Sequence, residues 1–154
     1  MAYIDQDSGE SDCIFCTKPR APDLRQALVV GQTAHCVVML NKYPYNNGHL
    51  LVAPKRHEKD LSSLPPEEYG DMNEALRRAV AIVRKIFGPG GVNLGMNLGK
   101  CAGAGIEEHM HWHIVPRWEG DTNFMPVLGE TRVMPQHLLE SYDRLKPHFE
   151  NFLG

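Results

Sequence analysis

The sequence lacks the features that mark membrane, secreted and nucleic-acid-binding proteins. No apolar run approaches the roughly 20 residues that a bilayer-spanning helix needs. The first residues are acidic and lack the apolar core of a signal peptide. The 154-residue chain has a formal net charge of −3, so it has no overall positive field to hold a nucleic-acid backbone. We therefore predict a cytoplasmic protein that binds neither membranes nor nucleic acids.

Cysteine is also scarce in this chain. A secreted disulfide framework is usually denser and shorter than four cysteines in 154 residues. Two of the four form the pair Cys13-x-x-Cys16, a spacing found in metal sites and in redox sites. Cys36 and Cys101 lie far apart in apolar or glycine-rich sequence, and we predict that both are inert buried thiols. By itself the Cys-x-x-Cys pair leaves zinc binding and an empty reduced pair both open.

Length and pattern predict one α+β domain. The chain is long enough to bury a substantial core, and we expect a loose polar N-terminus over residues 1–12 and a single domain over 13–154. Runs rich in apolar and β-branched residues predict strands at 28–30, 34–40, 48–54, 92–99 and 109–116. Because these strands lie on both sides of one long helical segment, we expect an antiparallel sheet of about five strands covered by that helix.

Two helices are predicted. Apolar residues recur every three or four positions between Tyr69 and Ile86, which indicates one face of a long helix. Ser62 or Ser63 is suited to cap its start, and the Gly-Pro-Gly-Gly sequence of residues 88–91 ends it. A C-terminal helix is expected over residues 135–146, stopping before Pro147.

The segment His-Met-His-Trp-His-Ile-Val, residues 109–115, places three of the eight histidines at strict alternation. Alternate side chains of a strand share a face, so His109, His111 and His113 are expected on one face, opposite core residues such as Met110. Imidazole is largely neutral near pH 7 and acts as nucleophile and proton carrier. The row therefore favours attack on phosphorus. A zinc site made of all three is the weaker alternative, and a single histidine on a strand is more often a surface or hydrogen-bonded residue.

Followed by Pro116-Arg117, this segment matches the motif His-φ-His-φ-His-φ-φ, in which φ is apolar, and it resembles the histidine triad superfamily. The upstream sequence NKYPYNNGHLLVAPKRH is similar to the same superfamily, and the downstream sequence RWEGDTNFMPVLGETRV is similar to its dinucleoside tetraphosphate phosphorylase branch. The resemblance covers about residues 13–134. It implies a nucleotide hydrolase or transferase that forms a covalent nucleotidyl-histidine, with water or inorganic phosphate as the acceptor.

The resemblance implies roles for three histidines. His111, the middle one of the triad, would attack the α-phosphate of the nucleotide and expel the rest of the molecule. His113 would support the reacting centre by hydrogen bonding, and His49 would complete the wall of the site. For this attack, one nitrogen of His111 must be free while the other donates its proton to a carbonyl group.

The resemblance also implies nucleotide contacts. Asn41 precedes His49 by eight residues, the spacing at which family members place a side chain that contacts the ribose, although an asparagine in this context is also a turn former. The glycine-rich loop with Ala104 and Gly105 has backbone amides suited to approach a phosphate. Many family hydrolases carry glutamine or a hydroxyl residue at those two positions, so side-chain help to the leaving group is in doubt here.

The resemblance implies two further metal ligands that would join the Cys-x-x-Cys pair. Some branches of the superfamily complete a zinc site with a histidine just after the Gly-His strand and with the first triad histidine. In this sequence those positions hold His57 and His109. We therefore predict a structural zinc bound by Cys13, Cys16, His57 and His109, and no catalytic metal.

The resemblance also implies a partner chain and a class of substrate. Family members commonly form two-fold dimers with a shared ten-stranded sheet, so the resemblance implies a homodimer. Trp118, Phe124 and Met125 are candidate contacts for the partner or for the base, and core packing explains them equally well. The expected substrate is a dinucleoside polyphosphate such as diadenosine tetraphosphate, with adenine as the base. Two other functions stay open: a nucleoside phosphoramidate hydrolase of the same family, and a zinc-stabilised nucleotide-binding module without turnover.

Overall fold

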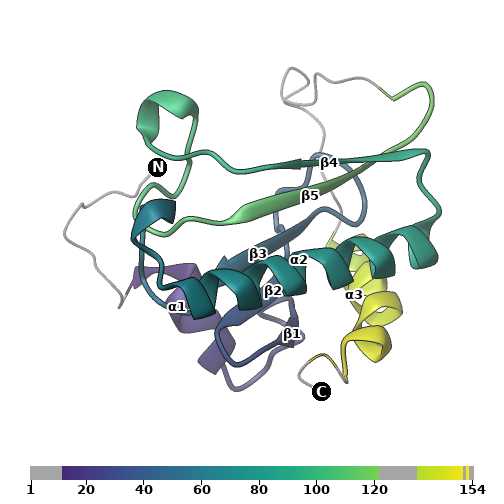
Figure 1. Cartoon of the computed structure of the whole chain (residues 1–154). Coiled ribbons are helices and arrows are strands. Elements are labelled where there is room, and N and C mark those ends of the chain that lie inside the picture. The colour runs from purple at the N-terminus through teal and green to yellow at the C-terminus, as the bar shows by residue number, and fades with distance from the viewer. Residues whose placement is uncertain (1–11, 122–134, 151, 153–154) are drawn as a thin grey trace.

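A computed structural model of the chain describes residues 12–121, 135–150 and 152. It has the predicted α+β architecture, an antiparallel sheet in the order β1-β2-β3-β5-β4 with a long helix across one face (Figure 1). The strands are β1 (Val29–Gln32), β2 (Cys36–Leu40), β3 (Leu50–Pro54), β4 (Gly91–Gly95) and β5 (Trp112–Arg117). The α-helices are α1 (Ile14–Thr17), α2 (Pro66–Phe87) and α3 (Pro135–Phe149), and the short 3-10 turns are η2 (Lys18–Arg20), η3 (Leu61–Ser63) and η4 (Lys100–Ala102).

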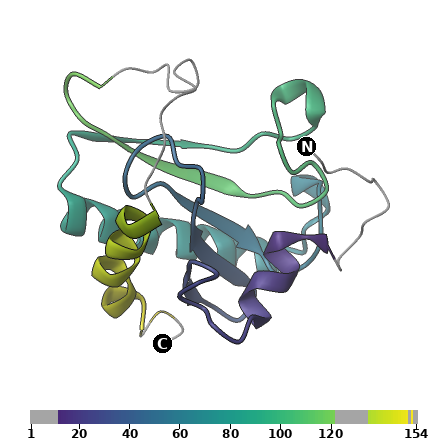
Figure 2. The ribbon, with the colours of Figure 1, turned by 180° about the vertical axis from the view of Figure 1, so that it is seen from behind.

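Both faces of the central strands are covered. Every residue of β2 and of β3 is buried, as their continuous apolar sequences predict. Alternate residues pack on α2 and α3 on one side and on the segment around α1 on the other. Figure 2, seen from behind, shows α1 on the face opposite α2. The core therefore has two layers, and the N-terminal segment that carries the Cys-x-x-Cys pair is part of one of them.

The long helix α2 begins and ends for identifiable reasons. Pro66 suits the first turn because its missing N–H would be unsatisfied there in any case. Gly88 ends the helix in the left-handed conformation, with φ of 58°, as the sequence predicts. The predicted cap is wrong: Ser62 and Ser63 lie in η3, where Asp60 accepts a hydrogen bond from the Ser62 amide. The helix buries Met72, Ala75, Ala79 and Val83.

Other boundaries also differ from the sequence prediction. Helix α3 continues through Pro147 to Phe149, because Pro147 lies in the last turn and removes only one backbone hydrogen bond there. Leu145 and Phe149 are buried on the sheet and hold this last turn in place. Strand β4 ends at Gly95, four residues early, where glycine-rich sequence follows. Within the described residues, no helix is both long and apolar enough to cross a membrane.

Two expectations fall on segments that the structure does not describe. Apart from Asp12, the N-terminal residues 1–12 lie outside the described residues, and so do Phe124 and Met125. Trp118 is described and half-buried, and its backbone N–H donates to Asp121 Oδ2 at 3.1 Å.

Gly48 connects the loop after β2 to the histidine that precedes β3, and we expect Gly48→Ala to destabilise the fold by about 2 kcal/mol or more. Its φ is +82°, and an added Cβ would lie 2.8 Å from Cε2 of the Phe87 ring. Urea unfolding measures the change. The matched control is Gly70→Ala in α2, where an added methyl meets no described atom within 4 Å. We expect this control to gain roughly 0.5–1 kcal/mol, and equal midpoints for the two variants would contradict the prediction.

Candidate functional site

Five of the eight histidines gather in two neighbouring groups on the face of the sheet that faces away from α2. The Cys-His cluster consists of Cys13, Cys16, His57 and His109. The histidine cluster consists of His49, His111 and His113. The segment of residues 109–113 contributes to both groups, so two sites share one piece of backbone.

This shared segment is only partly a strand. Strand β5 begins at Trp112, so His109 and His111 precede it, contrary to the prediction of a strand from residue 109. The alternation of faces still holds. Met110 and Ile114 pack into the core beneath α2, whereas the rings of His109 and His111 contact the Phe15 ring on the opposite face, at centroid distances of 5.1 and 4.8 Å.

The Cys-His cluster is assembled from three separate segments. Cys13 and Cys16 are brought together by α1, in which the Cys16 N–H donates to the Cys13 carbonyl at 3.1 Å. Their sulfur atoms lie close to two imidazole nitrogens: Cys13 Sγ is 3.2 Å from His109 Nδ1, and Cys16 Sγ is 3.3 Å from His57 Nδ1. The two Nδ1 atoms are 3.3 Å apart, and all four ligand atoms lie within 4.8 Å of one another.

These separations fit a tetrahedral zinc ion. With Zn–S bonds of about 2.3 Å and Zn–N bonds of about 2.0 Å, neighbouring ligand atoms lie roughly 3.3 Å (N to N) and roughly 3.5 Å (S to N) apart. His109 Nε2 donates its proton to the Pro54 carbonyl at 2.7 Å, which leaves Nδ1 as the free ligand atom. Burial lowers the pKa of His109 to about 4, so its ring is neutral at pH 7, as metal binding requires. Two thiols and two imidazoles, one of them oriented by a backbone carbonyl, form a donor set suited to zinc.

In the histidine cluster, hydrogen bonds assign the position of each imidazole proton. The Tyr45 N–H donates to His49 Nδ1 at 3.1 Å, so His49 carries its proton on Nε2. His49 Nε2 then donates to His113 Nδ1 at 2.9 Å, so His113 carries its proton on Nε2 as well. His111 Nδ1 donates to the His109 carbonyl at 2.9 Å. His111 therefore keeps an unprotonated Nε2, which is the atom with a lone pair for nucleophilic attack.

Burial keeps these rings uncharged. It lowers the pKa of His49 to about 3, of His113 to about 4, and of His111 in the same direction. Neighbouring imidazoles lower the pKa of His49 and of His113 further, because a second positive charge nearby is unfavourable. His49 is fully buried, whereas His111 keeps 8% of its surface exposed. At neutral pH the cluster thus places a largely buried, neutral imidazole with an unprotonated nitrogen beside a neutral donor.

The predicted nucleotide contacts lie beside this cluster. Asn41 Nδ2 lies 3.4 Å from the ring nitrogens of His49, while Asn41 Oδ1 accepts from the Tyr43 N–H at 2.9 Å, as a turn former does. In the glycine-rich loop the Ala104 N–H already donates to the Gly99 carbonyl at 3.2 Å. Gly105 is exposed. Nucleotide binding by Asn41, Ala104 and Gly105 stays a prediction.

The two remaining cysteines differ from each other. Cys36 is buried as predicted, and burial raises the pKa of its thiol to about 12, so it is unreactive at neutral pH. Cys101 is exposed, so its predicted burial is wrong. The short turn η4, between two glycines with positive φ, places this side chain on the surface.

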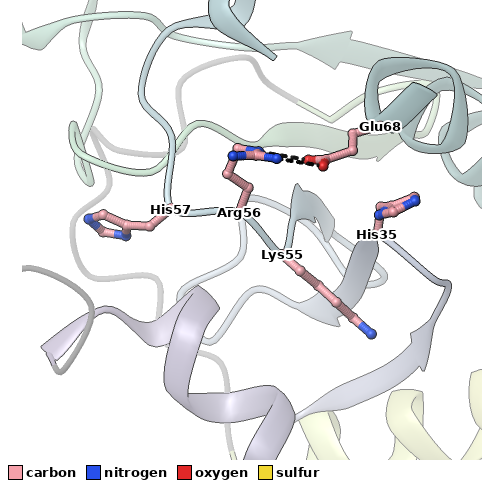
Figure 3. Close-up of a pocket in the computed structure, with 5 residues that line it drawn as sticks. All are labelled: His35, Lys55, Arg56, His57 and Glu68. Atoms are coloured by element: carbon pink, nitrogen blue, oxygen red, sulfur yellow. Dashed lines mark hydrogen bonds and ion pairs between the residues drawn. The ribbon is translucent and has the colours of Figure 1, made fainter. Parts of the chain in front are cut away.

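A cavity of about 480 Å³ is lined in part by His57 of the Cys-His cluster (Figure 3). Its lining consists of His35, Lys55, Arg56, His57 and Glu68. Arg56 and Glu68 form a two-point ion pair at 2.9 and 2.7 Å, so much of the charge in the cavity is balanced. Neither His111 nor His113 lines this cavity, so it is separate from the histidine cluster.

Comparison with known proteins identifies the family of this chain. Residues 25–120, which include every residue of the histidine cluster, match the family model of the HIT domain. The chain belongs to the HIT family. This HIT chain is 38% identical over 127 residues to the AP-4-A phosphorylase of Mycobacterium tuberculosis. The alignment covers 82% of the chain but only 65% of that relative, so the chain spans somewhat less than two thirds of its length.

Solved structures share the HIT fold. A zinc-bound histidine triad family protein from Mycobacterium smegmatis superimposes with a TM-score of 0.73 and 28% identity, covering 94% of this chain and 97% of that one. A hypothetical histidine triad nucleotide-binding protein from Sulfolobus tokodaii has a TM-score of 0.74 at 24% identity, with 91% and 93% covered, and shows the common fold.

Sequence reasoning predicted a carbonyl acceptor for the proton of His111, but it did not identify the three backbone groups that act in the HIT site. The Tyr45 amide and the carbonyls of Pro54 and His109 set the protonation of the histidines. They are backbone groups, so residue types give no direct sign of them. Tyr45 and Pro54 do lie within the NKYPYNNGHLLVAPKRH stretch that carries the family resemblance, and that is the only signal the sequence holds for them.

Proposed function

We propose that this HIT protein cleaves dinucleoside polyphosphates such as diadenosine tetraphosphate through a covalent nucleotidyl intermediate on His111. The observation that carries this proposal is the hydrogen bond from His111 Nδ1 to the His109 carbonyl, which leaves Nε2 unprotonated. The name of the 38% identical relative, AP-4-A phosphorylase, supports the substrate class and adenine as its base. The zinc-bound relative supports zinc in the Cys-His cluster as a structural ion.

In the first step, the lone pair of His111 Nε2 forms a bond to the α-phosphorus, and the bond from phosphorus to the bridging oxygen breaks. The bridging oxygen leaves with that electron pair on the departing nucleotide. The His113 Nε2–H is a donor for the negative charge that develops on oxygen. His111 keeps its proton on Nδ1, where it is donated to the His109 carbonyl, and this hydrogen bond stabilises the positive charge of the ring.

In the second step, an oxygen of water or of inorganic phosphate attacks the same phosphorus from the side opposite His111. The N–P bond breaks and its electron pair returns to Nε2, which restores the neutral ring. Any proton of the acceptor passes to solvent. Water releases a nucleoside monophosphate, and inorganic phosphate releases a nucleoside diphosphate, so two easier displacements replace one difficult one.

We also propose that two copies of the chain pair through the edge strand β4, as the family resemblance implies. Strand β4 is at one end of the sheet, and Leu94 within it is 46% exposed. Leu98, just beyond the strand, is 43% exposed. An edge strand with exposed apolar side chains is suited to pair with another strand, and such pairing would give the expected ten-stranded sheet.

A product assay distinguishes the possible activities. We expect diadenosine tetraphosphate to give ADP and ATP when inorganic phosphate is present, because the N–P bond of the intermediate is then cleaved by phosphate. AMP and ATP without phosphate would mean hydrolysis. Faster turnover of an adenosine phosphoramidate would favour the alternative activity on amine leaving groups. Binding of the dinucleotide with no product at all would contradict the proposal and support a binding module without turnover.

A further inference from the structure

We propose that Asn46, Arg117 and Asp121, called here the Asn46 clasp, act as positioning residues that fix the tautomers of His49 and His113. The clasp joins the loop between β2 and β3 to the end of β5 and to the turn that follows it. Its consequence for turnover rests on the proposed function, but its consequence for the imidazole protons does not.

Asn46 ties the two segments together. Its Nδ2 group donates to the Pro116 carbonyl at 2.9 Å and to Asp121 Oδ2 at 3.0 Å. These partners lie 70 and 75 residues further along the chain, so the contacts fix the loop against the end of β5 and the turn after it. The side chain of Asn46 thus uses both amide protons on fixed acceptors.

The acceptor side of the clasp is itself held rigidly. Arg117 donates to both carboxylate oxygens of Asp121, at 3.0 and 2.9 Å, and the Trp118 N–H adds a third bond at 3.1 Å. Arg117 Nη1 also donates to Asn93 Oδ1 at 2.8 Å, which ties the pair to β4. The Arg117 guanidinium holds the pKa of Asp121 well below its usual range, so the carboxylate is ionised at any pH of functional interest. Two-point pairs of this kind hold a fixed geometry.

The backbone of Asn46 and of the preceding residue contacts His49 directly. The Asn46 carbonyl accepts the His49 N–H at 3.2 Å, and the residue before Asn46 is Tyr45, whose N–H donates to His49 Nδ1 at 3.1 Å. The side chain of Asn46 therefore anchors the short stretch of backbone whose amide contacts the His49 ring. Neither Asn46 nor Asp121 contacts His111, which is why they are positioning residues and not catalytic ones.

The position of this amide determines two protons. While Tyr45 N–H donates to Nδ1 of His49, the His49 proton must be on Nε2, because a proton on Nδ1 would face another N–H. His49 Nε2–H then donates to His113 Nδ1 at 2.9 Å, so the His113 proton must be on Nε2. If the loop of residues 41–48 relaxes, both rings can exchange tautomers, and His113 loses its fixed donor.

The test uses zinc-loaded full-length protein labelled with ¹⁵N-histidine, in which long-range proton–nitrogen NMR spectra report which ring nitrogen carries the proton. We expect the wild-type protein and the control Asn47→Ala to show a single Nε2–H form of His49. Asn47 is the exposed neighbour of Asn46. In Asn46→Ala we expect mixed tautomers of His49 and His113, and kcat for diadenosine tetraphosphate about 10- to 100-fold lower with KM changed less than about threefold.

A second variant keeps the test decisive. If Asn46→Ala does not fold, Asp121→Asn removes the charge of the acceptor and is expected to shift the same tautomers in the same direction. Unchanged tautomers in a folded clasp variant would overturn the inference, whatever the activity. If the wild-type protein shows the single tautomers but does not turn over dinucleotides, the proposed function fails and the clasp stands.

Discussion

The variant His111→Ala is expected to lower kcat/KM for diadenosine tetraphosphate by about 10⁴-fold or more, while its affinity for nucleotide and its thermal stability stay close to those of the wild type. The size of this decrease in kcat/KM follows from removing the nucleophile itself, since the remaining hydrogen-bond donors still bind substrate but form no N–P bond. Of the histidine cluster, only His111 has an unprotonated nitrogen that is not already accepting a hydrogen bond among the described contacts. Steady-state kinetics and isothermal titration with a nucleoside monophosphate measure the two quantities.

Two further observations separate this outcome from a general loss of structure. The variant His137→Ala, at an exposed position of α3, is the matched control and should keep full activity. During turnover, wild-type protein quenched in base should carry one nucleotidyl group on the peptide that contains residue 111, and His111→Ala should carry none. Activity above about 1% of the wild type in His111→Ala, or a nucleotidyl group on another residue, would refute the assignment.

Much of the fold is predictable from the sequence because its elements are locally consistent. Strands β2 and β3 are buried along their whole length, so their sequences are continuously apolar. Helix α2 has a regular apolar stripe and a glycine at its end. The errors fall where tertiary packing decides the boundary: burial of Phe149 carries α3 past Pro147, and no serine side chain caps α2.

The candidate site also has features that the sequence predicts and features that only the fold determines. Histidine and cysteine positions are visible as residue types and spacings, and the structure does bring Cys13, Cys16, His57 and His109 together. The protons on the imidazoles are not visible in this way, because backbone carbonyl and amide groups fix them. Every residue type has these groups, so only the fold determines which of them meets a histidine ring. Spacing therefore predicts which histidines come together, and the hydrogen bonds determine which nitrogen of each carries the proton.

Zinc removal is expected to have the second large effect, on stability as well as on activity. We expect about one zinc per chain, and we expect Cys13→Ser to reduce the zinc content and to lower the free energy of unfolding by at least about 3 kcal/mol. Apparent zinc affinities of small structural sites correspond to roughly 10–16 kcal/mol, of which relaxation and thiol protonation recover a part. Elemental analysis and urea unfolding measure both changes.

The control for Cys13→Ser is Cys101→Ser, because Cys101 is exposed and outside the Cys-His cluster. It should keep its zinc and change stability by less than about 0.5 kcal/mol. Wild-type protein prepared without chelators that contains no zinc would contradict the prediction, as would equal unfolding midpoints for the two variants.

The shared backbone extends the effect of zinc to turnover. His109 contributes its Nδ1 to the Cys-His cluster, while its carbonyl accepts a hydrogen bond from His111 Nδ1 at 2.9 Å. A metal that fixes the His109 ring therefore also fixes the carbonyl that orients the nucleophile. We expect Cys13→Ser to lower kcat even at temperatures where the variant is still folded, because the His111 ring is then less well held. Full kcat in a folded, zinc-free variant would show that the two clusters act independently.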